Sequence, residues 1–394
     1  MKRSILILLV TVVLILPVAA QATVYEYSSD HYRVVSELSE ENARLTALEM
    51  EAMMNLYNDH FHFHVDQLPE KLRVRVFATK SRYDTYLRRL IDESRNGFVY
   101  LHYGDPAKSE LVGYSANDPD LRKSMIHQGF VQYFRSFIPD PPLWIREGFA
   151  VFFEDSRYDS DFDAAIYQEN VAWLDTLKSI TDGSAGLTPL SLDEMLTIDL
   201  DTARERIDVF YPQAWGMVSF LLNSENQDIN RILWDSLSAL SADADIEENE
   251  QAVINQAFAW VTEEDLVGDF LSYSTERRSF RGWVEYGIER YNAGNLDGAE
   301  QAFVKALKLN AANYVPHYYM GLINYERQNY TLADYYYQTA LETGADEPIT
   351  LYALGVNAYA DNRFDDAVTY LEMTVDRNPE YREKAEDLLV RIRG

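Results

Sequence analysis

The sequence predicts a helix-dominated protein, with an α+β domain at residues 23–278 followed by an all-α solenoid at residues 280–394. Two observations predict this division. Helical and strand-like patterns of apolar residues alternate through the middle two-thirds of the chain. From about residue 280, small and large residues recur at intervals of 34, which indicates a repeat of helical pairs. A third observation, an apolar stretch at the start, predicts that residues 1–22 are removed.

Composition argues against some classes of function. The 394 residues include 64 acidic side chains against 35 Lys and Arg, a formal net charge of −29. A charge of this size repels phosphate backbones, so we expect no nucleic-acid partner. The chain contains no cysteine, which excludes disulfides and thiolate metal sites.

The first 22 residues have the layout of a cleavable signal peptide. Lys2 and Arg3 precede an apolar run at 5–16, and Ala20 and Ala22 form a small-x-small cleavage site. The apolar run is short for a membrane span, and no later segment has the composition of one. We therefore expect cleavage near Ala22 and a periplasmic or secreted mature protein without a membrane span.

The first elements of the α+β domain are a helix and two strands. Residues 71–77 alternate apolar residues with arginines, the pattern of a half-buried strand, and residues 97–104 predict another. Residues 39–57 predict the helix that precedes them. The residues at helical spacing in this segment are Leu45, Leu48, Ala52 and Leu56.

Three histidines follow the first predicted helix. His60, His62 and His64 would share one face of a strand, a spacing that suits a metal ion. No motif places a carboxylate or a further histidine nearby, so we favour a structural role over a metal site.

Two helices are predicted next. Asp118 is the expected N-cap of the first, with Pro119 at its first helical position. The prolines of residues 138–142 end this helix, and residues 143–155 begin the second.

Residues 125–154 resemble the gluzincin group of zinc peptidases, the thermolysin-like clan. That family carries H-E-x-x-H on one helix and a ligand glutamate on the next. Here HQGFV stands at 127–131, and Glu147 in WIREGFA matches the ligand glutamate. The resemblance implies a metallopeptidase-like fold over most of residues 23–278. FYPQAWGMVSFLL, residues 210–222, is similar to the tyrosine-bearing helix of bacterial members.

Some of the residues that this family uses for catalysis and zinc binding are absent from the sequence. His127 matches the first zinc ligand, but Gln128 replaces the catalytic glutamate and has no usable basicity near neutral pH. Val131 replaces the second ligand and has no donor atom, which leaves two of the three protein ligands that catalytic zinc needs. Tyr211 matches the tyrosine that would stabilise the oxyanion, and it has nothing to assist without the metal.

We therefore expect no catalytic residue, no zinc and no other cofactor, with His127 and Glu147 forming a buried hydrogen-bonded pair. The alternative is that a distant residue, such as His102 or one of the histidines at 60–64, completes a zinc site.

The C-terminal third repeats with a period of 34 residues. Small residues let two helices approach closely, and large residues fill the gap to the next repeat. The pattern resembles the tetratricopeptide repeat family, with units at about 280–313, 314–347 and 348–381 and a capping helix after them. The positions in register are Gly287, Gly321 and Gly355; Tyr291, Tyr325 and Tyr359; Ala299, Ala333 and Ala367; and Phe303, Tyr337 and Leu371.

Repeats of this family present a concave groove, lined by the first helix of each pair, to a partner's peptide or helix. Tyrosine suits such a surface because it joins a large apolar body to a polar tip. The alternative is that the series at 291, 325 and 359 packs between repeats. The residues that the resemblance places in the groove are Tyr291, Tyr318, Tyr325, Tyr352 and Tyr359.

Together these features predict an exported scaffold protein of the cell envelope. It would bind a protein or peptide partner through its repeats and carry a catalytically retired peptidase-like domain. The alternative function is an active zinc peptidase that uses the repeats to select substrates.

Overall fold

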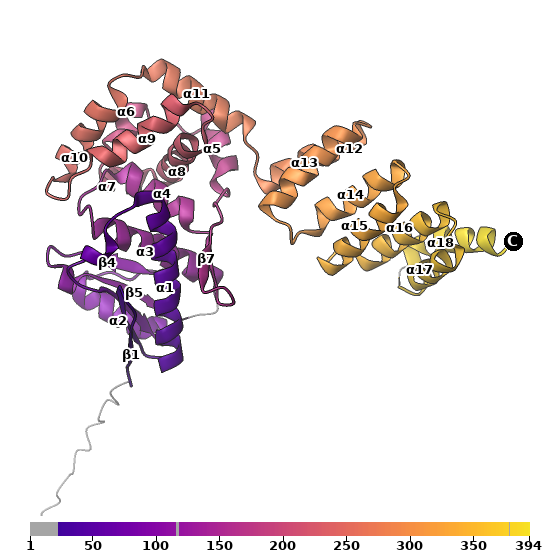
Figure 1. Cartoon of the computed structure of the whole chain (residues 1–394), viewed down its shortest axis with the longest axis horizontal. Helices are drawn as coiled ribbons and strands as arrows, with labels where there is room; N and C mark the ends of the chain where they lie inside the picture. Colours follow the sequence, from indigo (N-terminus) through magenta and orange to yellow (C-terminus); the bar gives the residue numbers. More distant parts are fainter. Residues whose placement is uncertain (1–22, 116–117, 378) are drawn as a thin grey trace, which may run out of the picture. The chain divides into compact units, whose positions relative to one another are not determined.

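The computed structural model describes residues 23–115, 118–377 and 379–394, so the predicted signal peptide lies outside the described residues. Helices dominate the chain, and a small mixed sheet lies near its N-terminal end (Figure 1). Two compact units divide the chain. Of the described residues, the first contains those up to Pro139 and Phe153–Gln168, and the second contains Asp140–Phe152 and those from Glu169 onward. Within the described ranges, no helix has the length and apolar character needed to cross a membrane.

The first unit is built on a five-stranded sheet of order β1-β2-β3-β5-β4. Strand β3 is parallel to β2 and β5, whereas the edge strands β1 and β4 are antiparallel to their neighbours. The predicted strand at 71–77 is confirmed as β3, and the segment 97–104 contains β4. The sequence analysis did not identify β1, β2 or β5. The strands are β1 (Tyr25–Ser28), β2 (Tyr32–Ser36), β3 (Leu72–Phe77), β4 (Val99–Leu101) and β5 (Glu110–Tyr114).

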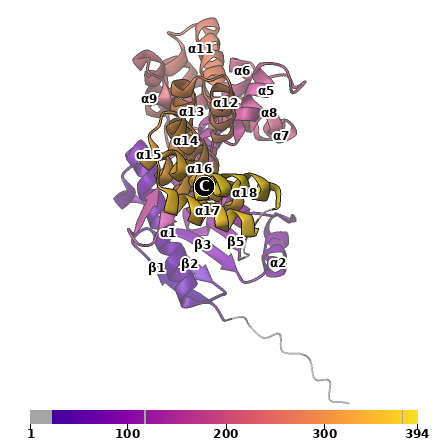
Figure 2. The same ribbon diagram turned by 90° about the vertical axis from the view of Figure 1, so that its right-hand side faces the viewer.

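Helices cover both faces of this sheet. Helices α1 (Glu40–Phe61) and α3 (Pro119–Arg135) pack against one face, and α2 (Lys80–Leu90) packs against the other. Figure 2 shows α1 and α2 on opposite sides of β3 and β5. Side chains alternate along each strand, so β3 can serve both layers. Phe77 and Val112 join Tyr83 and Leu87 of α2 in one apolar cluster.

Helix α1 confirms the predicted first helix, but its most buried face is offset from the predicted stripe, of which only Ala52 is buried. Met50 and Met53 are almost fully buried, whereas Leu45 is 40% exposed. The neighbouring helix α3 is the reason, because Met50 packs directly against Gly129 of that helix. A Cβ on Gly129 would lie only 2.8 Å from the Met50 Cε atom. The methionines and alanines of α1 therefore face α3 and the sheet, and the leucine stripe lies further round the helix.

The three histidines that follow do not share a strand face, so that prediction is wrong. His60 lies in the last turn of α1, and His62 caps the helix in the left-handed conformation with φ at 52°. The side chain of Asn58 closes the turn. Its Oδ1 accepts from the Phe63 N–H at 2.8 Å, and its Nδ2 donates to the Phe63 carbonyl at 3.1 Å. This local hydrogen bonding holds the chain in a cap rather than an extended strand.

Helix α3 begins as predicted. The Asp118 side chain accepts from the Asp120 N–H at 3.0 Å, and Pro119 stands in the first turn. The second predicted helix is confirmed as α4 (Leu143–Phe153). The short strand pair β6 (Arg157–Asp159) and β7 (Ala164–Ile166) follows it.

The second unit contains a group of helices centred on α8, whose side chains are mostly buried. Its π-helical segment η3 (Ile254–Phe258) continues directly from α10. The α-helices are α5 (Trp173–Thr181), α6 (Leu192–Leu196), α7 (Leu200–Glu205), α8 (Ile207–Asn223), α9 (Gln227–Ala239), α10 (Ile246–Val253) and α11 (Glu263–Glu276).

The remaining helices pack as successive pairs, α12 with α13, α14 with α15 and α16 with α17, and α18 packs on α17. A Cβ on Gly287 would lie 2.7 Å from the Phe303 ring, and a Cβ on Gly355 would lie 2.8 Å from Leu371. Gly321 faces Tyr337 in the same way. The helices are α12 (Phe280–Asn292), α13 (Leu296–Leu309), α14 (Tyr314–Glu326), α15 (Tyr330–Glu342), α16 (Glu347–Ala360), α17 (Phe364–Arg377) and α18 (Pro379–Arg393).

Candidate functional site

His127 lies in α3 and bonds to a carboxylate that the sequence analysis did not single out. Its Nδ1 is 3.0 Å from Oε2 of Glu154, the residue directly after α4, and both side chains are largely buried. A carboxylate on one ring nitrogen fixes the orientation of an imidazole, both in protein cores and at metal sites. This bond is therefore compatible with either interpretation of His127.

The two substituted positions of the motif have structural roles. Gln128 Oε1 accepts from the backbone N–H of Tyr100 at 3.1 Å, which ties α3 to the edge strand β4. Because an N–H can donate only to the oxygen of the carboxamide, this bond also fixes the orientation of the amide. Val131 is 6% exposed and packs as a core residue. Neither position offers a general base or a metal ligand.

Glu147 and Tyr211, which the resemblance singled out separately, meet in the second unit. Glu147 is 6% exposed, and its Oε2 accepts from the Tyr211 hydroxyl at 3.2 Å. Its Oε1 accepts from Arg146 Nε at 2.8 Å. The close approach of α4 and α8 makes this possible, because a Cβ on Gly148 would lie 2.6 Å from the Ala214 carbonyl oxygen. The buried charge of Glu147 is thus balanced by a guanidinium.

The residues at these positions do not fit a zinc site of the peptidase kind. Val131 has no donor atom, the carboxamide of Gln128 is bonded to a strand, and Glu147 is paired with a cation that would repel a metal ion. In the part of the chain that the structure describes, no three His, Asp or Glu side chains are grouped to hold a metal. We therefore derive no catalytic step through zinc.

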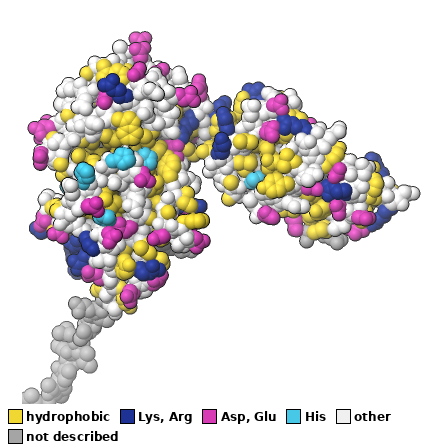
Figure 3. Space-filling model, in the orientation of Figure 1, with side chains coloured by type: hydrophobic (Ala, Val, Ile, Leu, Met, Phe, Trp, Pro, Cys, Tyr) yellow, Lys and Arg dark blue, Asp and Glu magenta, His cyan; other side chains and the backbone are white. Residues whose placement is uncertain are grey.

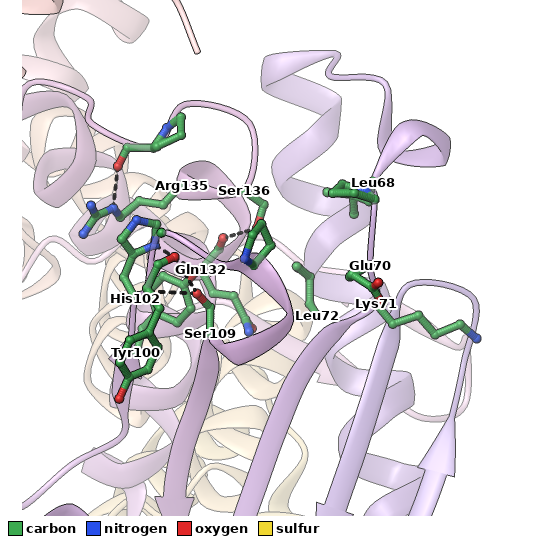
Figure 4. A pocket seen from close by; sticks show the side chains of 15 residues that line it. Leu68, Glu70, Lys71, Leu72, Tyr100, His102, Ser109, Gln132, Arg135 and Ser136 are labelled. Carbon is green, nitrogen blue, oxygen red and sulfur yellow. Dashed lines mark hydrogen bonds between the residues drawn. The ribbon is translucent and has the colours of Figure 1, made fainter. Parts of the chain in front are cut away.

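His102, the suggested substitute ligand, lies just beyond β4. Its Nδ1 is 3.3 Å from the hydroxyl of Tyr100, and burial raises the pKa of that tyrosine. His102 also lines a small pocket at this end of the sheet (Figure 4).

The five tyrosines assigned to the groove lie on the first helices of the three pairs and are all half-buried. The Tyr291 hydroxyl donates to Glu326 Oε1 at 2.7 Å. The Tyr352 ring lies 5.5 Å from the ring of Tyr381 in α18. Burial, with a contribution from nearby tyrosines, raises the pKa of Tyr318 to about 12. Each tyrosine thus packs against neighbouring helices and keeps part of its surface open.

Hydrophobic side chains also gather on the face of the paired helices that is turned to the viewer in Figure 3. Among the partners that sequence reasoning missed are Arg146, Glu154 and Tyr381. Arg146 stands next to Glu147 in WIREGFA, so its charge was a visible signal. Glu154 and Tyr381 are brought close only by folding.

Comparison with models of known protein families gives no match, and comparison with curated proteins gives none either.

Proposed function

We propose that this protein binds a protein or peptide partner through helices α12–α18, and that its first two-thirds form a peptidase-like domain that does not hydrolyse peptides. One observation carries the proposal. Five half-buried tyrosines lie on the first helices of three successive pairs, where a tetratricopeptide-type groove would have its lining. Half-buried tyrosines are held in place by packing and still offer ring and hydroxyl to a partner.

The pairing of the helices supports the assignment to tetratricopeptide-like repeats. Each glycine of the 34-residue register faces the large residue 16 positions later, as at Gly287 and Phe303. Repeating one contact in three consecutive pairs is what a solenoid requires, because each unit buries its apolar face only against its neighbours. Helix α18 would serve as the cap.

The bonds of the motif residues support the proposal of a retired site. An active gluzincin needs a carboxylate base at position 128 and an imidazole at position 131. The glutamine at 128 is engaged with β4, and the valine at 131 is buried. We place the protein outside the cytoplasm, in the periplasm or secreted, because residues 1–22 have the layout of a signal peptide.

Site-specific photocrosslinking tests the groove. A photoreactive phenylalanine analogue replaces Tyr325 or Tyr352 in the full-length protein within its native cells. The matched control is Tyr335 of α15, a tyrosine that is 60% exposed. We expect the same discrete adduct from both groove positions and none from position 335. Equal adducts at all three positions, or none at either groove position, would contradict a groove-specific partner.

Metal analysis and a peptidase assay test the retired site. The purified wild type should carry no stoichiometric zinc and should not hydrolyse a peptide library. The variant Val131→His adds an imidazole one turn from His127 on α3, so it should gain zinc affinity. Its control is Val131→Asn, which is polar but a poor zinc ligand. Tight zinc in the wild type that is lost in His127→Asn would restore the enzyme interpretation.

A further inference from the structure

Tyrosines from successive helices of the repeats lie close together. The ring of Tyr352 in α16 lies 5.5 Å from the ring of Tyr381 in α18. Burial raises the pKa of Tyr352, and the nearby Tyr325 of α14 and Tyr381 contribute to this shift. Burial also raises the pKa of Tyr318 in α14 to about 12, again with a contribution from Tyr381. These side chains therefore influence one another across three helices.

Tyr291 of α12 connects this group to a carboxylate. Its hydroxyl donates to Glu326 Oε1 at 2.7 Å, which joins α12 to the end of α14. Burial raises the pKa of Tyr291, and Glu326 and Tyr318 raise it further, so the hydroxyl remains a donor at neutral pH. We name this group the tyrosine cluster, and its members are Tyr291, Tyr318, Tyr325, Tyr352 and Tyr381.

The carboxylates beside the tyrosine cluster are not neutralised by basic residues. Helices α14 and α16 contain no Lys or Arg. Glu326 is bonded to a tyrosine, and Asp346, the N-cap of α16, accepts from the Ile349 N–H at 3.2 Å. In the described part of the chain, neither of these two carboxylates forms an ion pair with a Lys, Arg or His. The cluster therefore lies in a negative electrostatic environment.

Basic side chains near the ends of these helices already have partners. They pair with carboxylates or lie over a ring outside the tyrosine cluster, as in Arg281 with Glu285, Arg290 with Tyr286, and Arg327 with Asp297 and Glu300. Lys384 of α18 differs, because its Nζ lies 5.3 Å from the centre of the Tyr381 ring. A further cation is disfavoured at that end of the cluster, so we expect one at the end nearer Glu326.

Rings and carboxylates together select the charge of a ligand. An anionic ligand would face Glu326 and Asp346 as well as the net charge of −29. The face of a tyrosine ring attracts a cation. Arginine suits both features, because its planar guanidinium stacks on an aromatic ring and donates in a fork to a carboxylate.

We propose that the tyrosine cluster binds an arginine of the partner, with the guanidinium stacked on a tyrosine ring and donating to Glu326. The partner would then present a basic, arginine-containing segment to the first helices of the repeats. This inference rests on the proposed function, since it specifies the chemistry of the partner that the repeats bind.

The test compares two peptides that differ in charge. One is a dodecapeptide of alternating Arg and Ser. In the other, citrulline replaces each Arg, which keeps a similar shape and removes the positive charge. Binding to the full mature chain is measured by isothermal titration calorimetry at about 0.15 M salt, where long-range attraction is screened. We expect the arginine peptide to bind about tenfold more tightly, through cation–π contacts and an ion pair.

Glu326→Gln removes the carboxylate and keeps the shape of the side chain. It should reduce the preference for the arginine peptide to about threefold. The matched control is Glu342→Gln in α15, an exposed glutamate of a second helix. This control changes the net charge of the chain by the same amount, so a preference that depends only on net charge would fall equally in both variants. We expect it to keep the tenfold ratio.

The double variant Tyr325→Leu with Tyr352→Leu removes two rings and leaves the net charge unchanged. We expect its preference to fall below about threefold, because the cation–π contacts are lost. Tyr335→Leu, at the exposed tyrosine of α15, is the control and should keep the tenfold ratio. If the double variant does not fold, the comparison of Glu326→Gln with Glu342→Gln decides.

Photocrosslinking at positions 325 and 352 separates this inference from the proposed function. Excess arginine peptide, added to a cell extract before irradiation, should suppress the adduct, and the citrulline peptide should not. Adducts that persist with the arginine peptide would overturn the inference and leave the proposed function intact. No adduct without peptide would contradict the proposed function itself. Equal affinity of the wild type for both peptides, or equal losses in the two glutamine variants, would also overturn the inference.

Discussion

The α3–α4 segment and the helical pairs α12–α17 differ in how strictly their role requires a particular residue type at each position. In the first region, the resemblance to a zinc peptidase depends on a few donor atoms. Two of those positions, Gln128 and Val131, now bond to a strand or fill a core. In the second region, the contact of each glycine is made by a different large side chain, either phenylalanine, tyrosine or leucine.

This difference follows from what each region requires. A catalytic metal site needs a particular donor atom at each position, so one substitution removes a ligand. Helix packing needs volume and shape, which several residue types supply. The repeats therefore tolerate Thr374 where the other units have Ala306 and Ala340. The Thr374 hydroxyl donates to the Tyr370 carbonyl of its own helix at 2.9 Å, so its burial leaves no unpaired group.

The largest expected effect comes from removing Arg146, the cation that pairs with the buried Glu147 of α4. Arg146→Met removes the guanidinium that contacts the buried Glu147. We expect the free energy of unfolding to fall by about 3 kcal/mol at pH 7, because a buried carboxylate loses a charged partner. Urea titration of the mature chain measures this. The double variant with Glu147→Gln should recover most of the loss, and a loss below about 1 kcal/mol would contradict the idea.

A smaller effect is expected in the repeats. Gly321→Val places a branched side chain against the Tyr337 ring. Overpacking should lower the free energy of unfolding by about 2 kcal/mol in the same titration. The control is Gly268→Ala in α11, where a Cβ would meet no atom within 4 Å. That change should stabilise the helix by up to about 1 kcal/mol. A tolerated valine at 321 would show that the close contact is not needed.

Tyr211→Phe should cost about 1 kcal/mol, because it removes one neutral donor from Glu147 and keeps the ring. Tyr335→Phe, at an exposed tyrosine of α15, serves as the control and should leave stability unchanged. Thermal unfolding of both variants is the measurement. Equal effects at the two positions would mean that the hydroxyl of Tyr211 does not stabilise the fold.

The smallest expected effect concerns Glu250, whose pKa is raised by burial, in contrast to Glu147, which is paired with Arg146. Burial, with a contribution from Glu247, raises the pKa of Glu250 in α10 from 4.5 to about 7. The folded state then holds the proton more tightly than the unfolded state, so this contribution to stability is present at low pH and is lost as pH rises from about 4.5 to 7.

Glu250→Gln should remove this loss. Its stability should match the wild type near pH 4.5 and exceed it above pH 7 by no more than about 1 kcal/mol, after allowance for solvent screening. Melting temperatures at five pH values measure the difference, with the exposed Glu225→Gln as control. A constant difference across the pH range would be inconsistent with a raised pKa.

The sequence by itself determined the local elements whose signals are short-range. The cap at Asp118, the alternation in β3 and the 34-residue register all depend on residues within one element or on a fixed period, so they could be recognised without the fold. The same reasoning failed for the histidines at 60–64, because alternating aromatic residues occur both in strands and at a helix end. Only the hydrogen bonds of Asn58 distinguish the two.

Only the tertiary structure decided which groups meet across the sequence. The buried face of α1 was set by contact with α3, so that Ala52 of the predicted stripe is buried whereas Leu45 is exposed. Glu154, which bonds to His127, is 27 residues away in the sequence, and the pocket wall that contains Gln132 is assembled from several elements. Periodicity describes one element at a time, whereas burial and hydrogen bonding depend on what the neighbouring element presents.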